Sequence, residues 1–127
     1  MAGRRSRGVT LVLWACQVVA AAAFVAAGGA KLAGAVPMVQ MFDTIGIGQW
    51  FRYVTGSIEV ASAVLLLVPR LAAFGAALLL CTMVGAIIAH LTVLHTSPAG
   101  PVVLLTMVSI VLWFRGSVIR AMLVRSS

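Results

Sequence analysis

Acidic residues are almost absent from this sequence. Its 127 residues contain only two, Asp43 and Glu59, against nine lysines and arginines, and charged residues make up 9% of the chain. That share is about a third of the average for soluble proteins. A soluble domain could not hide the apolar surface that 63% hydrophobic residues provide. The composition therefore predicts that lipid surrounds most of the chain.

Cysteine and histidine are also scarce. Cys16 and Cys81 lie far apart without a C-x-x-C pair, so both are interpreted as small buried hydrophobes rather than a redox couple. The two histidines, His90 and His95, are five residues apart, which separates them by about 140° around a helix. They do not share a face, so we expect no metal site and no bis-histidine haem.

Long apolar runs dominate what is present. Four of them, at residues 9–32, 52–68, 71–94 and 101–120, predict membrane-spanning helices. The first run could instead be a signal peptide, but it is longer than the 7–15 apolar residues of such a segment, so a retained span is favoured. The expected fold is an all-α, four-helix transmembrane bundle in one domain, residues 1–127.

The segment between the first two runs predicts a short helix. Pro37 suits a first helical turn, and a break follows at Gly46. The apolar residues between them recur at helical spacing, with polar residues on the opposite face. The apolar set is Met38, Met41, Phe42 and Ile45, and the polar set is Gln40, Asp43 and Thr44. Such a pattern is typical of a helix lying in the membrane interface.

The basic residues gather at the ends of the apolar runs, which indicates membrane topology rather than nucleic-acid binding. With both termini cytoplasmic, two of the nine lie outside, Lys31 and Arg52. The other seven lie inside: Arg4, Arg5, Arg7, Arg70, Arg115, Arg120 and Arg125. Because cytoplasmic loops carry the excess of lysine and arginine, we expect this orientation.

Glu59 is the one carboxylate inside an apolar run, and it organises the candidate site. A charge within a span costs several kcal/mol, so it normally faces a bundle interior and is paired. Arg52 lies seven residues earlier on nearly the same helix face. Lys31 and His90 fall in the same outer half of the membrane. These four residues are candidates for a ligand site or an ion pair that fixes helix register. A quinone head group would suit an outward-opening pocket of this kind.

Three segments together resemble the DoxX-like family of small bacterial membrane proteins. They are FVAAGGAKL at residues 24–32, GSIE at 56–59 followed by LLLVPR at 65–70, and GAIIAHL at 85–91. The resemblance implies a four-helix membrane bundle in the bacterial plasma membrane. It also implies kinship with subunits of quinone-linked oxidoreductases, such as thiosulfate:quinone oxidoreductase, and with membrane complexes that handle oxidative and thiol stress. Lys31, Glu59 and His90 match the family's recurrent polar positions, to which the family assigns no catalytic role.

The expected function is that of an accessory subunit in a redox-related membrane complex that binds a quinone. Whether the chain is itself an enzyme stays open. Because it has no redox cysteine motif, the sequence argues against a self-sufficient thiol oxidoreductase. One alternative is a non-enzymatic scaffold or assembly factor whose charges only fix the fold. Another is a small transporter, which would have to form a homo-oligomer to build a path. Besides the lipid bilayer, the expected partners are other membrane proteins.

Overall fold

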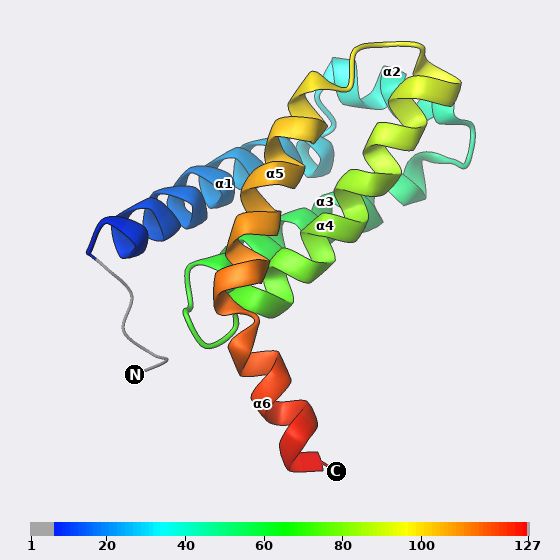
Figure 1. Ribbon diagram of the computed structural model, residues 1–127. Coiled ribbons are helices and arrows are strands. Elements are labelled where there is room, and N and C mark those ends of the chain that lie inside the picture. The colour runs from blue at the N-terminus through cyan, green and yellow to red at the C-terminus, as the bar shows by residue number, and fades with distance from the viewer. Residues whose placement is uncertain (1–6, 127) are drawn as a thin grey trace.

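The computed structural model describes residues 7–126, and every regular element in that part of the chain is helical. The elements are α1 (Arg7–Ala33), α2 (Val36–Ile45), α3 (Gln49–Leu66), α4 (Ala72–Ala89), the π-helical turn η1 (His90–Leu94), α5 (Ala99–Arg115) and α6 (Ser117–Ser126) (Figure 1). The all-α fold class predicted from the sequence is confirmed.

One apolar core holds the four long helices together. α1 packs chiefly against α3, and α4 packs against α5, while contacts between α3 and α4 join the two pairs. Each long helix contributes a fully buried side chain to this core: Phe24, Leu66, Leu79 and Val108. The short helix α2 contacts α3 and η1, and α6 projects from the opposite end of the long helices (Figure 1).

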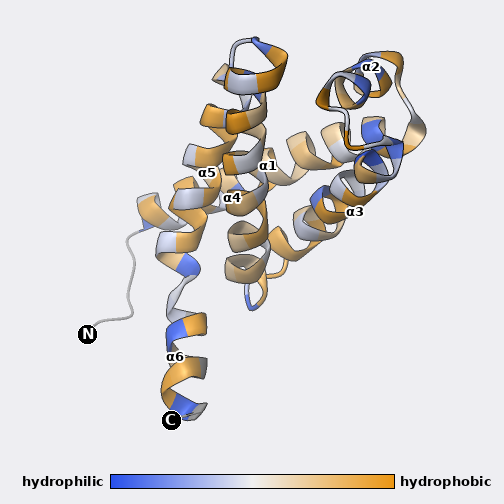
Figure 2. Ribbon diagram, turned by 90° about the vertical axis from the view of Figure 1, so that its right-hand side faces the viewer, coloured by the Kyte–Doolittle hydropathy of each residue, from blue (hydrophilic) through white to orange (hydrophobic). Residues whose placement is uncertain are grey.

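Two helices of the described chain are long and apolar enough to cross a membrane by length and composition. They are α1 and the continuous run of α4 and η1, Ala72–Leu94. A third candidate arises if α5 and α6, which are bent by 46° relative to each other, form one span. Hydrophobic residues lie along α1, α4 and α5 in Figure 2, and many of their large apolar side chains are exposed. These features are those of a membrane protein.

The helix boundaries differ from the expected runs at two places. The second run, expected over residues 52–68, is α3, which begins earlier at Gln49 and ends at Leu66. The fourth run, expected over residues 101–120, is interrupted at Gly116, where α5 ends and α6 begins at a new angle. Ser117–Ser126 therefore forms a separate helix at an angle to α5 and does not continue it as one straight span.

The short helix predicted in the connector is confirmed as α2. Pro37 lies in its first turn, and Gly46 ends it in the left-handed conformation, φ 81°, with its N–H donating to Phe42 O. Phe42 is buried, and the predicted polar face is exposed at Gln40, Asp43 and Thr44. Its location in a membrane interface stays a prediction.

Candidate functional site

Two glycines bring α1 and α3 into close contact. A Cβ added at Gly28 would lie 2.8 Å from Gly56 O and 3.1 Å from Glu59 Cβ. A Cβ added at Gly56 would lie 3.0 Å from both Gly28 O and Lys31 Cβ. Neither position has room for a side chain, as is usual where small residues let helix backbones approach. The crossing therefore sets Lys31 of α1 directly against the polar face of α3.

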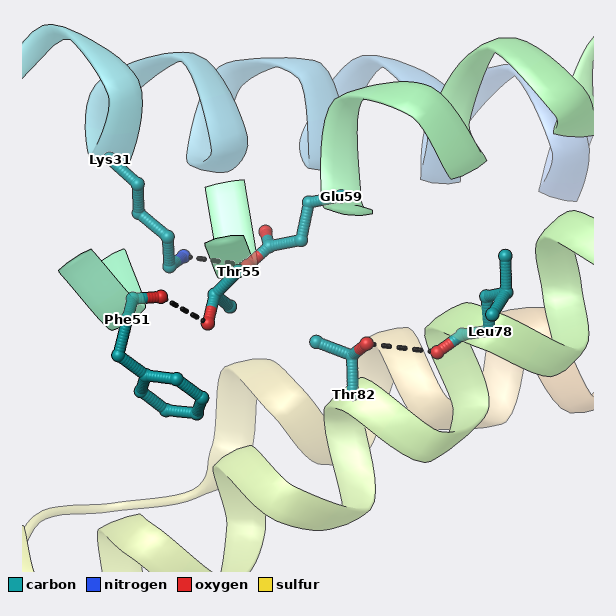
Figure 3. A network of polar contacts seen from close by, with 6 residues as sticks. All are labelled: Lys31, Phe51, Thr55, Glu59, Leu78 and Thr82. Atoms are coloured by element: carbon teal, nitrogen blue, oxygen red, sulfur yellow. Dashed lines mark hydrogen bonds and ion pairs between the residues drawn. The ribbon is translucent and has the colours of Figure 1, made fainter. Parts of the chain in front are cut away.

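Lys31 and Glu59 form a buried ion pair across this crossing. Lys31 Nζ lies 2.9 Å from Glu59 Oε1, and the two side chains are 12% and 2% exposed (Figure 3). Because Lys31 is near the end of α1, its ammonium is the partner that reaches closer to the surface. The sequence offered Lys31 and Arg52 as partners of Glu59, and the recorded ion pair joins it to Lys31.

The second carboxylate oxygen of Glu59 has no hydrogen-bond partner among the described residues. The same is true of Ser62 Oγ, one turn further along α3, and both atoms are buried. A buried polar atom without a partner costs about 1–3 kcal/mol, and such atoms mark sites where water or a ligand supplies the missing bond. Figure 3 shows Thr82 of α4 on the side that faces Thr55 and Glu59 of α3. The hydroxyls of Thr55 and Thr82 each donate within their own helix, to Phe51 O at 2.8 Å and to Leu78 O at 2.9 Å, so Glu59 Oε2 and Ser62 Oγ are the buried atoms of α3 left without a partner.

Arg52 fixes the end of α1 rather than contacting Glu59. α1 ends in a Schellman motif: Ala35 N–H donates to Ala30 O at 3.0 Å, and Gly34 N–H donates to Lys31 O at 3.3 Å. Arg52 Nη1 also donates to Lys31 O, and its Nε donates to Gln49 Oε1 at 2.7 Å. A cation at a helix C-terminus is favourable because it meets the exposed carbonyls there. Arg52 therefore anchors the residue that pairs with Glu59.

His90, the first residue of η1, is held by the turn that follows η1. Its Nδ1 lies 2.6 Å from Thr96 Oγ1, and its backbone oxygen accepts a hydrogen bond from Thr96 N–H at 3.0 Å. These contacts fix the exit from η1. That His90 shares a cavity with Glu59 stays a prediction. No group of three or more histidine, cysteine, aspartate or glutamate residues in positions 7–126 is arranged to hold a metal ion.

A second polar contact joins the helices in the first half of α1, at Gln17. The buried Gln17 donates from Nε2 to Leu66 O at 2.6 Å, which joins α1 to α3. Its Oε1 accepts from Arg115 Nε and Nη2 at 3.1 and 3.0 Å. The sequence presented Arg115 only as a topology charge, and nothing in its local pattern indicates a partner 98 residues away.

Residues 15–112 of the chain match the model of the DoxX-like family. The chain belongs to the DoxX-like family. The match covers more than half of the sequence and runs from the first part of α1 into α5, so it includes Lys31, Arg52, Glu59 and His90. The family resemblance noted from three short segments is thereby confirmed. Searches of curated proteins and of solved structures found no match to this DoxX-like chain.

Proposed function

We propose that this DoxX-like protein is a single domain, residues 1–127, that crosses the bacterial plasma membrane four times. The spans would be α1, α3, α4 with η1, and α5. The hydropathy of α3 alone does not mark it as a span. Its two charged side chains, Arg52 and Glu59, are nevertheless buried against other helices rather than exposed to lipid. A span whose charges face the protein interior is the arrangement that a bilayer tolerates.

Both termini would lie in the cytoplasm, with α2 in the outer interface. Support comes from the distribution of positive charge over the helix ends. Five arginines lie at the start of α1, between α3 and α4, at the end of α5 and within α6: Arg7, Arg70, Arg115, Arg120 and Arg125. Only Lys31 and Arg52 lie near the other ends. Arg4 and Arg5, which the sequence adds to the inner side, lie outside the described residues.

The Lys31–Glu59 pair would bind the head group of a lipid-like ligand, and a quinone fits its chemistry. The observation that carries this proposal is that Glu59 Oε2 is buried without a hydrogen-bond partner, whereas Glu59 Oε1 is paired with Lys31. Lys31 has N–H donors for a quinone carbonyl oxygen, and Glu59 Oε2 can accept from a hydroxyl of the reduced form. A bound quinone would supply two-electron redox chemistry, while these side chains would orient its head group.

The electrons would come from a partner, since the chain has no C-x-x-C motif. The corresponding role is an accessory subunit of a redox-related membrane complex. The competing function is a non-enzymatic scaffold or assembly factor. It is favoured by the closed 2.9 Å ion pair, because two opposite charges that neutralise each other need no ligand for charge balance.

Quinone content separates the two functions. The protein would be purified in mild detergent from quinone-containing membranes, and bound quinone would be extracted and quantified by mass spectrometry. We expect Glu59→Gln to lose most of the quinone, because the amide changes the hydrogen bonding at the buried oxygen. Asp43→Asn is the matched control, since it removes the only other carboxylate side chain, which is exposed on α2. Parent protein without quinone would instead support the scaffold.

A further inference from the structure

The short helix α2 lies across the end of the bundle where α1 ends, α3 begins and η1 follows α4 (Figure 1). It packs against α3 and against η1. Glu59 lies ten residues into α3, about 15 Å from the start of the helix at 1.5 Å per residue. Because the Glu59 side chain is only 2% exposed, the protein must open before a ligand can contact it.

One face of α3 leads from α2 to Glu59. Phe51, Thr55 and Glu59 are spaced four residues apart, which places them on the same face of the helix, and Figure 3 shows Thr55 between the other two. At the α2 end of this face, the Phe51 ring packs edge-on against the Phe42 ring, with the ring centroids 5.9 Å apart. Phe42 of α2, which is 4% exposed, therefore covers the start of the face that leads to Glu59.

The connections on both sides of α2 are built on glycine. Gly34 precedes the helix with φ 74°, and Gly46 and Gly48 follow it with φ 81° and 123°. Glycine adopts either sign of φ at little cost, and a few positions at the ends of an element absorb the rotation when a lid moves. The backbone on both sides of α2 is therefore suited to a change in the angle of the helix.

The attachment of α2 to the bundle is slight. Phe42 is the buried residue of this helix. Gln49, the first residue of α3, donates from Nε2 to Val39 O at 3.0 Å and to Asp43 Oδ1 at 3.2 Å. Segments with few buried apolar contacts open locally at a lower free energy than the rest of a fold. α2 is accordingly the element at this end that can detach while α1, α3 and α4 stay packed.

We propose that α2 is a lid over the Glu59 site. The lid turns on its flanking glycines and withdraws Phe42 from Phe51, which uncovers the face of α3 that leads to Glu59. The inference rests on the proposed function in that a quinone head group is the ligand that the lid would admit. Opening nevertheless exposes Glu59 whether or not a quinone binds, so a reagent for carboxyl groups can detect it without the ligand.

The rate at which dicyclohexylcarbodiimide labels Glu59 measures lid opening. This apolar reagent forms a stable acylurea on a carboxyl group, and mass spectrometry of the Glu59 peptide from the full chain in mild detergent quantifies the product. Phe42→Ala removes the ring that covers the site and should speed the labelling about tenfold, a shift of about 1.4 kcal/mol in the opening equilibrium. Val36→Ala is the matched control, because it shortens an α2 side chain that is 67% exposed, and it should change the rate about twofold or less.

A reversible cross-link tests the movement itself. Asp43→Cys and Gln49→Cys would be introduced after Cys16 and Cys81 have been replaced by alanine, and the new thiols would be joined by a short bis-methanethiosulfonate linker. The parent side chains at these two positions are 3.2 Å apart, so the linker holds α2 against the start of α3. Reduction and capping of the thiols release α2 in the same protein. Labelling of Glu59 should be about fivefold slower, or more, while the linker is closed.

Equal labelling rates with the linker closed and released would overturn the lid, because Glu59 would then be reached by another route, such as from the lipid side between α3 and α4. Labelling of Phe42→Ala no faster than that of Val36→Ala would overturn it as well. Both results are independent of quinone content. Parent protein without quinone would contradict the proposed function, whereas the labelling rates decide whether α2 opens over Glu59.

Discussion

We predict that removing Lys31 and removing Glu59 from their ion pair destabilise the protein by different amounts. Removing the cation by Lys31→Met leaves the Glu59 carboxylate, 2% exposed, without its partner. Removing the carboxylate by Glu59→Leu leaves Lys31, which is 12% exposed and two residues from the end of α1. A lysine near a helix end extends its ammonium to the interface and water. The cation is therefore the more costly partner to remove.

The expected magnitudes follow from burial. Breaking a buried pair so that one charge stays behind costs about 3–5 kcal/mol, and we assign this cost to Lys31→Met. Glu59→Leu should cost about 1.5–3 kcal/mol, the contribution of a hydrogen bond to a charged group. The double variant leaves no charge and should be less destabilised than Lys31→Met alone, because replacing both members of a buried pair by apolar residues is often neutral.

Reversible unfolding in detergent or in lipid discs would measure all four proteins of this double-mutant cycle. We expect a coupling free energy above about 1.7 kcal/mol, the upper end for neutral hydrogen bonds between membrane helices. Two results would refute the reasoning. The first is a Lys31→Met variant no less stable than Glu59→Leu, and the second is a double variant whose loss equals the sum of the single losses.

Two further predictions concern packing and topology. Gly28→Val should separate α1 from α3 and destabilise the protein by several kcal/mol, because its Cβ would lie 2.8 Å from Gly56 O. Gly29→Val is the control, because no atom lies within 4 Å of a Cβ added there. Equal unfolding temperatures of the two variants would contradict the close crossing of α1 and α3. Reporter fusions after Arg125 and within residues 95–101 should report the cytoplasmic and the outer side respectively, and a C-terminal reporter active only outside would reverse the proposed orientation.

The local sequence pattern determined two of the helices and the burial of the one carboxylate inside an apolar run. The long apolar run of α1 and the period of α2 follow from composition and spacing, which are properties of the chain itself. The burial of Glu59 also follows from the sequence, because a carboxylate inside an apolar helix is too costly to leave facing lipid. The family segments at residues 24–32 and 56–59 carry the glycines and charges that later meet across α1 and α3.

The tertiary structure decided which partners these residues take. Lys31 and Arg52 were equal candidates for Glu59, because sequence fixes depth along a helix but not how two helices are rotated and crossed. Contact between Gly28 and Gly56 sets that crossing, so Lys31 reaches Glu59 while Arg52 binds the end of α1.

Contacts between residues that are far apart in sequence could not be predicted for the same reason. The bond of Arg115 to Gln17 spans 98 positions, and no local period encodes it. His90 is fixed by Thr96 because the chain turns at His95, directly after η1, and the break at Gly116 redirects α6. The sequence by itself thus determined that the Glu59 carboxylate must be buried, but not the burial of every apolar side chain, since Cys81, interpreted as buried, is exposed. Only packing determined the partners of the polar side chains, since a side chain reaches a distant partner only after the helices have docked.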